Sequence, residues 1–551
     1  MLILASLFTA LADDDPVLNA TSQEIERVWP ILTQEEESPH WLGIGVNDVI
    51  EYRVQATHGS KMSPDISHMR TADIDIRVGT PELDSTHPLR DSGWFNEDTH
   101  FEIELPIEDD PLAIQSALWL GIDTAYRSGV RRIIKIRTNN TVKVEIEDQS
   151  GDWSVSPVTE HIEELTPLAI DILDWQNKLQ SVSSAALGYP EVYDSFAALD
   201  AKREIRYFVD SDGNRIRQQF IRFRVSVFAE TIAEDGMELK SYDYIDAHSL
   251  DNLPSVETIT QMMHSTAQKV TDLRNAPVVD PYVGPAILRG RAAAVFFHEI
   301  LGHRAEGHRQ KDDTEGQTLT DKVNEVIFPD FITVVDDPTL QNWNGLDLNG
   351  YYRVDDEGVN AQKVIVVEDG VLRNFLMSRS PIEGFDQSNG HGRRDLGYAP
   401  VSRQGNLIVS SDTTMPYQSL KTALLKEIRQ QGKPFGLIFD DISGGFTFTG
   451  RTTPNSYNVQ PVTVWKVYPD GREELVRGVD MIGTPLLTFS RIKAASETQQ
   501  VFNGSCGAES GWVPVSAIAP DLLVSEVEVQ RRDKGTNRPP LLSPPTAGER
   551  Q

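Results

Sequence analysis

Polar and apolar residues alternate over several short segments in the first half of the chain, a pattern typical of β-strands with one buried face. These segments are residues 74–78, 143–146, 205–209 and 218–229, and an Asp212-Gly213-Asn214 turn predicts that the last two form a hairpin. Apolar residues recur every three or four positions at residues 110–128, 165–180 and 255–275, which predicts amphipathic helices. The mixture indicates an N-terminal α/β and linking region over residues 13–275.

Prolines at positions 277, 281 and 285 mark a change of pattern and predict a boundary within residues 276–284. We expect an apolar helix at residues 286–301, and then a polar segment with two glycines, residues 307–321, that is mobile. Another helix is expected at residues 420–431. The other apolar runs of this half are short and bounded by turn residues, which predicts strands at residues 331–335, 361–367, 405–409, 434–440, 462–468, 475–482 and 522–529.

These patterns predict an α+β protein in which an N-terminal α/β domain is followed by a β-rich C-terminal domain at residues 276–530. The strands of the second domain are expected to form a curved or barrel-like sheet that carries the helix at residues 286–301. Residues 531–551 contain two Pro-Pro pairs and are expected to form a disordered tail.

The composition and net charge argue against several classes of protein. Hydrophobic residues make up 39% of the 551 positions, enough for a folded protein rather than a disordered one. The net charge is 51 − 83 = −32, which opposes binding to nucleic acid phosphates and to anionic lipid. No apolar run approaches the roughly 18 to 20 residues of a membrane helix. We therefore expect neither a nucleic-acid partner nor a membrane span.

The first twelve residues have a different character. An apolar run over residues 2–12 ends in Ala10-Leu11-Ala12, directly before three aspartates, which favours a signal peptide at residues 1–12 and hence export. The run lacks a basic leader, so a packed N-terminal segment or a misassigned start is the alternative. Cys506 is the single cysteine and cannot form an internal disulfide, so it does not decide the compartment.

The segment with the clearest chemistry is His298-Glu299-Ile300-Leu301-Gly302-His303, which lies in an apolar context. A neutral imidazole binds zinc at about 2.0–2.1 Å, and a neighbouring carboxylate can take a proton from water whose pKa the ion lowers towards about 7. This pairing predicts a Zn²⁺ site in which His298 and His303 are ligands and Glu299 is the general base.

The spacing of the two histidines also predicts a local distortion. The common helical signature places its histidines at i and i+4, whereas His303 follows His298 at i+5. On a regular helix, i+5 lies about 140° around the axis, too far for both imidazoles to reach one ion. A π-bulge or a helix end at Gly302 would bring His303 back towards His298.

A catalytic zinc site usually has three protein ligands and one open position. Cys506 is our candidate for the third ligand, because a thiolate binds zinc strongly and its flanking glycines predict a loop that allows close approach. His308 and Glu306 are the competing candidates.

Each of these residues also has a simpler interpretation. Three fixed positions can occur by chance on a helix surface, a lone cysteine is often an inert core side chain, and His308 and Glu306 would ordinarily be solvated loop residues. The apolar context argues against chance for the motif, because buried polar groups need partners.

Together these residues resemble the TldD/PmbA metallopeptidase family, also called modulators of DNA gyrase. The resemblance is strong from about residue 285 to residue 530 and weaker before it. It is carried by His298, Glu299, His303 and Cys506, and by the segments 333–338, 354–358, 392–394, 403–406, 442–445, 478–483 and 506–515.

The resemblance implies a TldD-like catalytic subunit, with His298, His303 and Cys506 holding zinc and Glu299 as the base. It implies extended or unfolded peptides as substrates, which enter an enclosed cavity and add a strand to the C-terminal sheet. It also implies a cytoplasmic setting and a dimer with an identical or related subunit. The alternative is a non-catalytic zinc-binding or scaffolding subunit of a peptidase dimer. His308 departs from the family pattern, in which an acidic residue is expected.

Overall fold

The computed structural model describes residues 15–88, 100–139, 148–312, 314–451, 456–532, 538–540 and 542. The expected signal peptide at residues 1–12, the expected strand at residues 143–146 and most of the expected tail lie outside these residues. Within the described part of the chain, no helix is both long enough and apolar enough to cross a membrane.

The N-terminal half forms one curved nine-stranded sheet in the order β4-β3-β1-β7-β8-β6, with β2, β5 and β9 added to β1, β3 and β8. All of its long strands pair antiparallel with their neighbours. The strands are β1 (Pro39–Thr57), β2 (Ser60–Lys61), β3 (Asp65–Thr80), β4 (Leu83–Asp84), β5 (His100–Glu104), β6 (Glu160–Ile162), β7 (Asp194–Asp210), β8 (Arg215–Ile232) and β9 (Glu238–Ala247).

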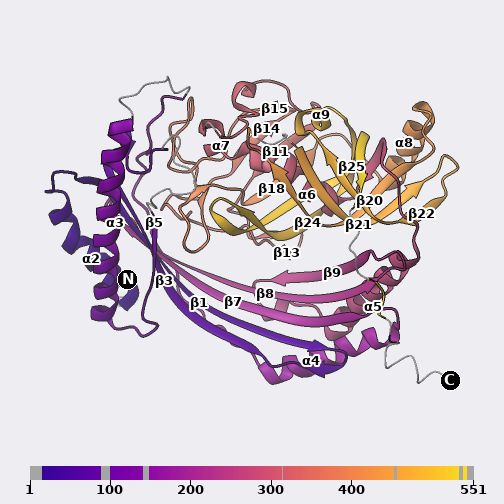
Figure 1. The fold of residues 1–551 in the computed structure, drawn as a ribbon, viewed down its shortest axis with the longest axis horizontal. Helices are drawn as coiled ribbons and strands as arrows, with labels where there is room; N and C mark the ends of the chain where they lie inside the picture. The colour runs from indigo at the N-terminus through magenta and orange to yellow at the C-terminus, as the bar shows by residue number, and fades with distance from the viewer. Residues whose placement is uncertain are drawn as a thin grey trace, which may run out of the picture.

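Four helices cover one face of this sheet: α2 (Pro16–Leu32), α3 (Pro111–Asn139), α4 (Ile172–Ser184) and α5 (Val256–Asn275). Alternate residues of the strands pack against them, and two apolar cores result, one under α2 and α3 and the other under α4 and α5. The intervening residues of β1, β7, β8 and β9 are largely polar or charged and point towards the C-terminal half, which lies above the concave side of the sheet (Figure 1).

The C-terminal half is built on a twelve-stranded sheet. Because β10 pairs with both β20 and β25, the strands β10, β20, β21, β23 and β25 close into a ring. The strands are β10 (Tyr282–Leu288), β11 (Ile332–Asp336), β14 (Val364–Glu368), β15 (Val371–Leu372), β18 (Asn406–Ser411), β19 (Thr414–Met415), β20 (Gly436–Phe448), β21 (Ser456–Val467), β22 (Glu473–Val476), β23 (Val479–Gly483), β24 (Ile492–Ala508) and β25 (Gly511–Arg531).

The buried helix α6 (Gly290–Ile300) packs against β20, β24 and β25 within the main C-terminal core. Beyond it lie a 3₁₀ turn, η3 (Gly302–Ala305), and the short α7 (His308–Lys311), and the half also contains α8 (Tyr417–Gln430) and α9 (Pro485–Phe489). The short pairs β12 (Asn342–Trp343) with β13 (Leu346–Asp347), and β16 (Gly392–Arg393) with β17 (Val401–Ser402), form two small sheets. The chain is therefore a mixed α/β protein with a β-rich C-terminal half.

Three expected helices have different bounds in the structure. The helix expected at 286–301 was wrong in its first turn, because Ala286–Leu288 pair with two strands and the helix begins at Gly290. The helix expected at 165–180 begins at Ile172, where Asp171 caps it after Pro167 has interrupted the pattern. The helix expected at 110–128 continues to Asn139.

The helix α2 was missed, although Asp15-Pro16 is a recognisable start, with an N-cap aspartate and a proline at N1.

Candidate metal centre

Helix α6 ends between the two histidines of the motif. Its last residue is Ile300, the C-cap Leu301 is distorted to φ −113°, and His303 lies in the following 3₁₀ turn. The break that the i+5 spacing predicted is therefore present as a helix end, and not as a π-bulge. It places His303 on the same side as His298, with the ring centroids 5.0 Å apart.

Side chains from elsewhere satisfy the backbone carbonyls that the helix end leaves without partners. Arg304 donates to the carbonyl oxygen of Glu299 at 2.8 Å, and Gln404 Nε2 donates to that of His298 at 3.4 Å. The Gln404 amide lies against the backbone of Gly302, where a Cβ atom would be 1.9 Å from its Oε1. A larger residue at position 302 would therefore displace the Gln404 amide from this position.

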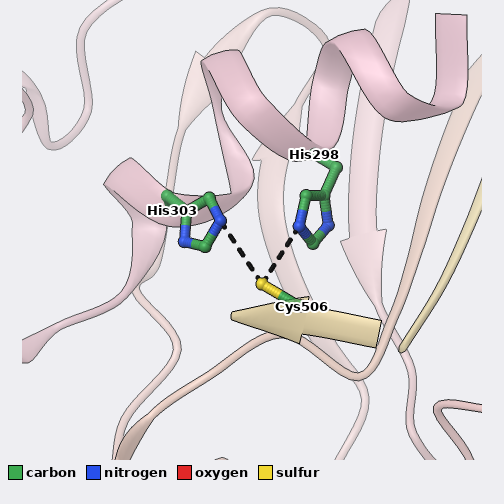
Figure 2. Close-up of side chains that lie close together, drawn as sticks. All are labelled: His298, His303 and Cys506. Atoms are coloured by element: carbon green, nitrogen blue, oxygen red, sulfur yellow. Dashed lines mark hydrogen bonds between the residues drawn. The ribbon is translucent and has the colours of Figure 1, made fainter. Parts of the chain in front are cut away.

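Cys506 lies opposite the two histidines. Its Sγ is 3.1 Å from His298 Nε2 and 3.3 Å from His303 Nε2, and all three side chains are at least nine-tenths buried (Figure 2). The loop expected around Cys506 was wrong, because the residue lies in β24, paired with Val513 of β25. Strand pairing therefore positions the thiol more rigidly than a loop would.

Electrostatics in this cluster favour a thiolate. Burial opposes ionisation of Cys506, but the charges of His303 and His298 and their hydrogen bonds to the sulfur lower the pKa of the thiol well below its ordinary value. Burial likewise opposes protonation of the histidines, whereas Cys506 raises the pKa of both.

The donor set suits zinc. Two imidazole nitrogens and one thiolate are within 4.8 Å of one another, and among the described residues no fourth donor joins this group. In a tetrahedral zinc site, nitrogen and sulfur ligands are about 3.5 Å apart, close to the distances found here. Three ligands leave one position open, as in catalytic zinc sites.

Glu299 lines the same cavity as the cluster, and its Oε2 is buried with no hydrogen-bond partner. Burial raises the pKa of this carboxyl, against the lowering effect of the histidine charges. Gly445 of β20 lies directly against it, since a Cβ atom at this position would be 2.9 Å from Glu299 Cγ. The carboxylate is thus held next to the cluster with one oxygen free.

Glu306 is not the solvated loop residue that its position suggested. It is fully buried, and its Oε2 is 3.2 Å from His303 Nδ1 and 2.8 Å from Arg309 Nε. Burial opposes its ionisation, yet the neighbouring charges of His303 and Arg309 lower its pKa to about 2. Glu306 therefore contacts the outer nitrogen of His303 and does not join the group of three donors.

His308 also lies away from the three donors. Its Nε2 pairs with Glu509, in the turn between β24 and β25, and Arg309 Nη2 reaches the same carboxylate at 2.8 Å. Glu306, His308 and Glu509 form a second close group of potential ligands, but Arg309 occupies it by pairing with both carboxylates. The segment expected to be mobile thus has buried residues at Arg309 and Gln310.

Sequence reasoning assigned no role to Arg403 and Gln404, which precede β18. Arg403 is fully buried; it donates to the carbonyl oxygen of Cys506 at 2.5 Å, and its Nε is 3.5 Å from Glu306 Oε1. It therefore joins the strand that carries Cys506 to the carboxylate beside His303. The sequence signals that could have indicated it are a charged residue at the start of an apolar strand and its place in one of the segments that carry the family resemblance.

Comparisons with known proteins identify relatives of this chain. Residues 282–531 match the PmbA/TldA metallopeptidase C-terminal domain. A metalloprotease of Archaeoglobus fulgidus is 24% identical over 409 residues, 72% of this chain and 83% of that protein. A zinc metalloprotease TldD homolog of Saccharolobus solfataricus is 25% identical over 250 residues, 44% of this chain and 51% of that protein.

The fold as a whole is shared with a solved structure, that of TldE from Thermococcus kodakarensis. The superposition has a TM-score of 0.58 and a sequence identity of 15%. It covers 92% of this chain and 100% of the TldE chain. Residues 282–531 therefore form a C-terminal domain of the PmbA/TldD family, and the chain is similar to proteins named metalloproteases.

Proposed function

We propose that this protein is a TldD-like zinc peptidase in which His298, His303 and Cys506 hold the metal and Glu299 is the general base. The observation that carries the proposal is the meeting of three donor atoms from segments about two hundred positions apart, beside a carboxylate with a free oxygen. A relative bearing the name zinc metalloprotease supports the choice of metal.

Bound zinc would act as a Lewis acid on a scissile carbonyl and would lower the pKa of water at the site. Glu299 accepts a proton from the attacking water and returns it to the leaving nitrogen, as general base and then general acid. The buried imidazoles and thiolate supply a preorganised binding set.

Extended peptides are the substrates that the surroundings support best. The cluster opens into a cavity of about 900 Å³. One wall of the cavity is β20. On one edge this strand pairs with β10 only as far as Phe439, and on the other edge it pairs with β21 as far as Phe448. Among the described residues, the edge at Ile442–Thr447 has no strand partner, and these residues line the cavity. A peptide strand could pair there through main-chain hydrogen bonds with little dependence on its sequence.

The second candidate is a non-catalytic subunit with structural zinc. A structural site prefers four protein ligands and has no need of a base, whereas here three donors converge beside Glu299. This difference favours the enzyme. A dimer with an identical or related subunit is part of the proposal by family resemblance, and the mass in solution, measured by light scattering, tests it.

Glu299→Gln is the experiment that separates the two functions. We expect unchanged zinc content and loss of turnover on an unstructured peptide by about 10²–10⁴-fold, because only the proton acceptor is removed. Equal activity in the variant would reject Glu299 as the base. Absence of activity in zinc-loaded wild type on every peptide tried would favour the non-catalytic subunit.

A further inference from the structure

A second cavity adjoins the candidate metal centre. It has a volume of about 600 Å³ and lies between the concave face of the N-terminal sheet and the hairpin of β24 and β25. Arg224, Ser505 and Trp512 line both cavities, so the two lie side by side. The side chain of Arg224 also contacts β24 directly, because its Nη2 is 3.4 Å from the carbonyl oxygen of Asn503.

The floor of this cavity is a charged sheet face. Strand register places Glu51, Lys202 and Arg222 in one row across β1, β7 and β8, and Arg53, Asp200 and Arg224 in the next. Most of the cations have a carboxylate of their own within 3.2 Å. These pairs are Arg53 with Asp200, Lys202 with Glu51, Arg206 with Asp356, Arg224 with Asp246 and Arg394 with Asp73.

Arg222 is different from these cations. Within the described residues it forms an ion pair with Glu204, at 3.5 Å, longer than an ordinary hydrogen bond. Glu204 is already engaged, since it accepts a hydrogen bond from Arg206 Nε at 2.6 Å and has Lys202 at 3.8 Å. Burial and the nearby arginines lower the pKa of Arg222 to about 10, which agrees with a cation short of negative charge.

We propose that Arg222 is the centre of an anion subsite that binds a carboxylate of the peptide substrate, in the cavity next to the metal centre. The inference rests on the proposed peptidase function and adds a substrate preference to it. The guanidinium has free donors, projects into the cavity and is 17% exposed, so a carboxylate can reach it without displacing Glu204. An extended peptide that leaves the metal centre past Ser505 runs towards this side chain, which is two residues before Arg224 on the same strand face.

The carboxylate can be an acidic side chain or the C-terminus of the peptide, and matched peptides distinguish the two. The test uses otherwise uncharged, C-terminally amidated octapeptides with one Glu scanned through each position, Gln counterparts, and one peptide with a free C-terminus. Binding is measured by fluorescence anisotropy in a Glu299→Gln background, and KM by hydrolysis with Glu299 intact. We expect at least one Glu position, or the free C-terminus, to bind about tenfold more tightly than its neutral counterpart.

Variants at positions 222 and 53 test whether Arg222 causes this preference. Arg222→Met should abolish it, Arg222→Lys should keep part of it, and Arg53→Met should leave it intact, since Arg53 lines the same cavity but is paired with Asp200. Thermal unfolding checks that each variant is folded, and the wild-type comparison of acidic and neutral peptides needs no variant. A preference that survives Arg222→Met, or wild type that hydrolyses acidic and neutral peptides equally, would overturn the subsite while leaving the peptidase proposal standing. If zinc-loaded wild type binds these peptides in a carboxylate-dependent way but hydrolyses none of them, the subsite stands and the peptidase proposal is rejected.

Discussion

The carboxylate of Glu306 lies 3.2 Å from Nδ1 of His303, the ring nitrogen that faces away from Cys506. A carboxylate in this position fixes the ring orientation of a metal-binding histidine and raises its basicity. Glu306 is itself held by Arg309 and Arg403. We therefore expect it to act on the metal through His303, without being a ligand.

Glu306→Gln should weaken zinc binding by about 10–100-fold, as loss of such partners does in other zinc proteins. Competition with a chromophoric chelator measures the dissociation constant. Glu315→Gln is the matched control. Its carboxylate also pairs with Arg309, with Oε1 2.8 Å from Nη1, but it does not contact His303. Unaltered zinc affinity in Glu306→Gln would show that the carboxylate only pairs with Arg309 and Arg403 and has no effect on the metal.

Removal of the thiol should empty the site. Cys506→Ala deletes one of three ligands, so we expect zinc content after dialysis to fall well below one equivalent and stabilisation by added zinc to disappear. Metal analysis and thermal unfolding measure the two effects. His308→Ala should retain its zinc, since His308 pairs with Glu509 away from the cluster. Full occupancy in Cys506→Ala would instead make His308 or Glu306 the third ligand.

Gly445→Ala should lower kcat with little change in zinc content. A Cβ atom at this position would lie 2.9 Å from Cγ and 3.2 Å from Oε1 of Glu299, so the carboxylate must shift. A displacement of about 1 Å at a catalytic group can cost about 10²-fold in rate. Gly188→Ala, with no atom within 4 Å of the added Cβ, controls for the substitution itself. Equal loss of activity in both variants would contradict the proposed contact.

Stability should fall as the pH rises through neutrality, because Glu357 and its neighbour Asp355 are buried carboxyl groups with raised pKa values. Burial raises the pKa of both groups, and the charge of Glu357 raises that of Asp355 further. Burial raises the pKa of Glu357 to about 7, although Arg379 donates a backbone hydrogen bond to it at 2.6 Å. The folded state thus holds a proton that the unfolded chain releases near pH 4.5, so its stabilising contribution is present at low pH and lost as the pH rises through about 7.

Urea unfolding at pH 5, 6, 7 and 8 measures this effect. The free energy of unfolding should decrease over this range by on the order of 1–3 kcal/mol for wild type, and the decrease should be smaller in Glu357→Gln. Identical pH dependence in both proteins would assign the effect to other groups.

Much of the fold could be predicted from periodicity, and the errors have local causes. Residues 286–288 continue an apolar helical pattern, but they pair with β20 and β25, and these partners are more than 140 positions away in the sequence. Cys506 has a different cause: its glycine-rich neighbourhood indicates a loop, but the residue lies in the hairpin of β24 and β25, where it pairs with Val513. Local propensity is a weak guide where distant strands supply the hydrogen bonds.

The sequence by itself determined the chemistry that is available: two histidines at a spacing that requires a broken helix, an adjacent glutamate, one cysteine and a family pattern around them. A distortion between His298 and His303 followed from helix geometry alone, and the structure decided that it is a helix end and not a π-bulge. Only the tertiary structure decided which other groups meet there. It placed Cys506 within 3.3 Å of both imidazoles, kept His308 away with Glu509, and left Arg222 with a shared carboxylate in a cavity. Such contacts depend on the pairing and packing of segments far apart in the chain, which no local pattern of residues specifies.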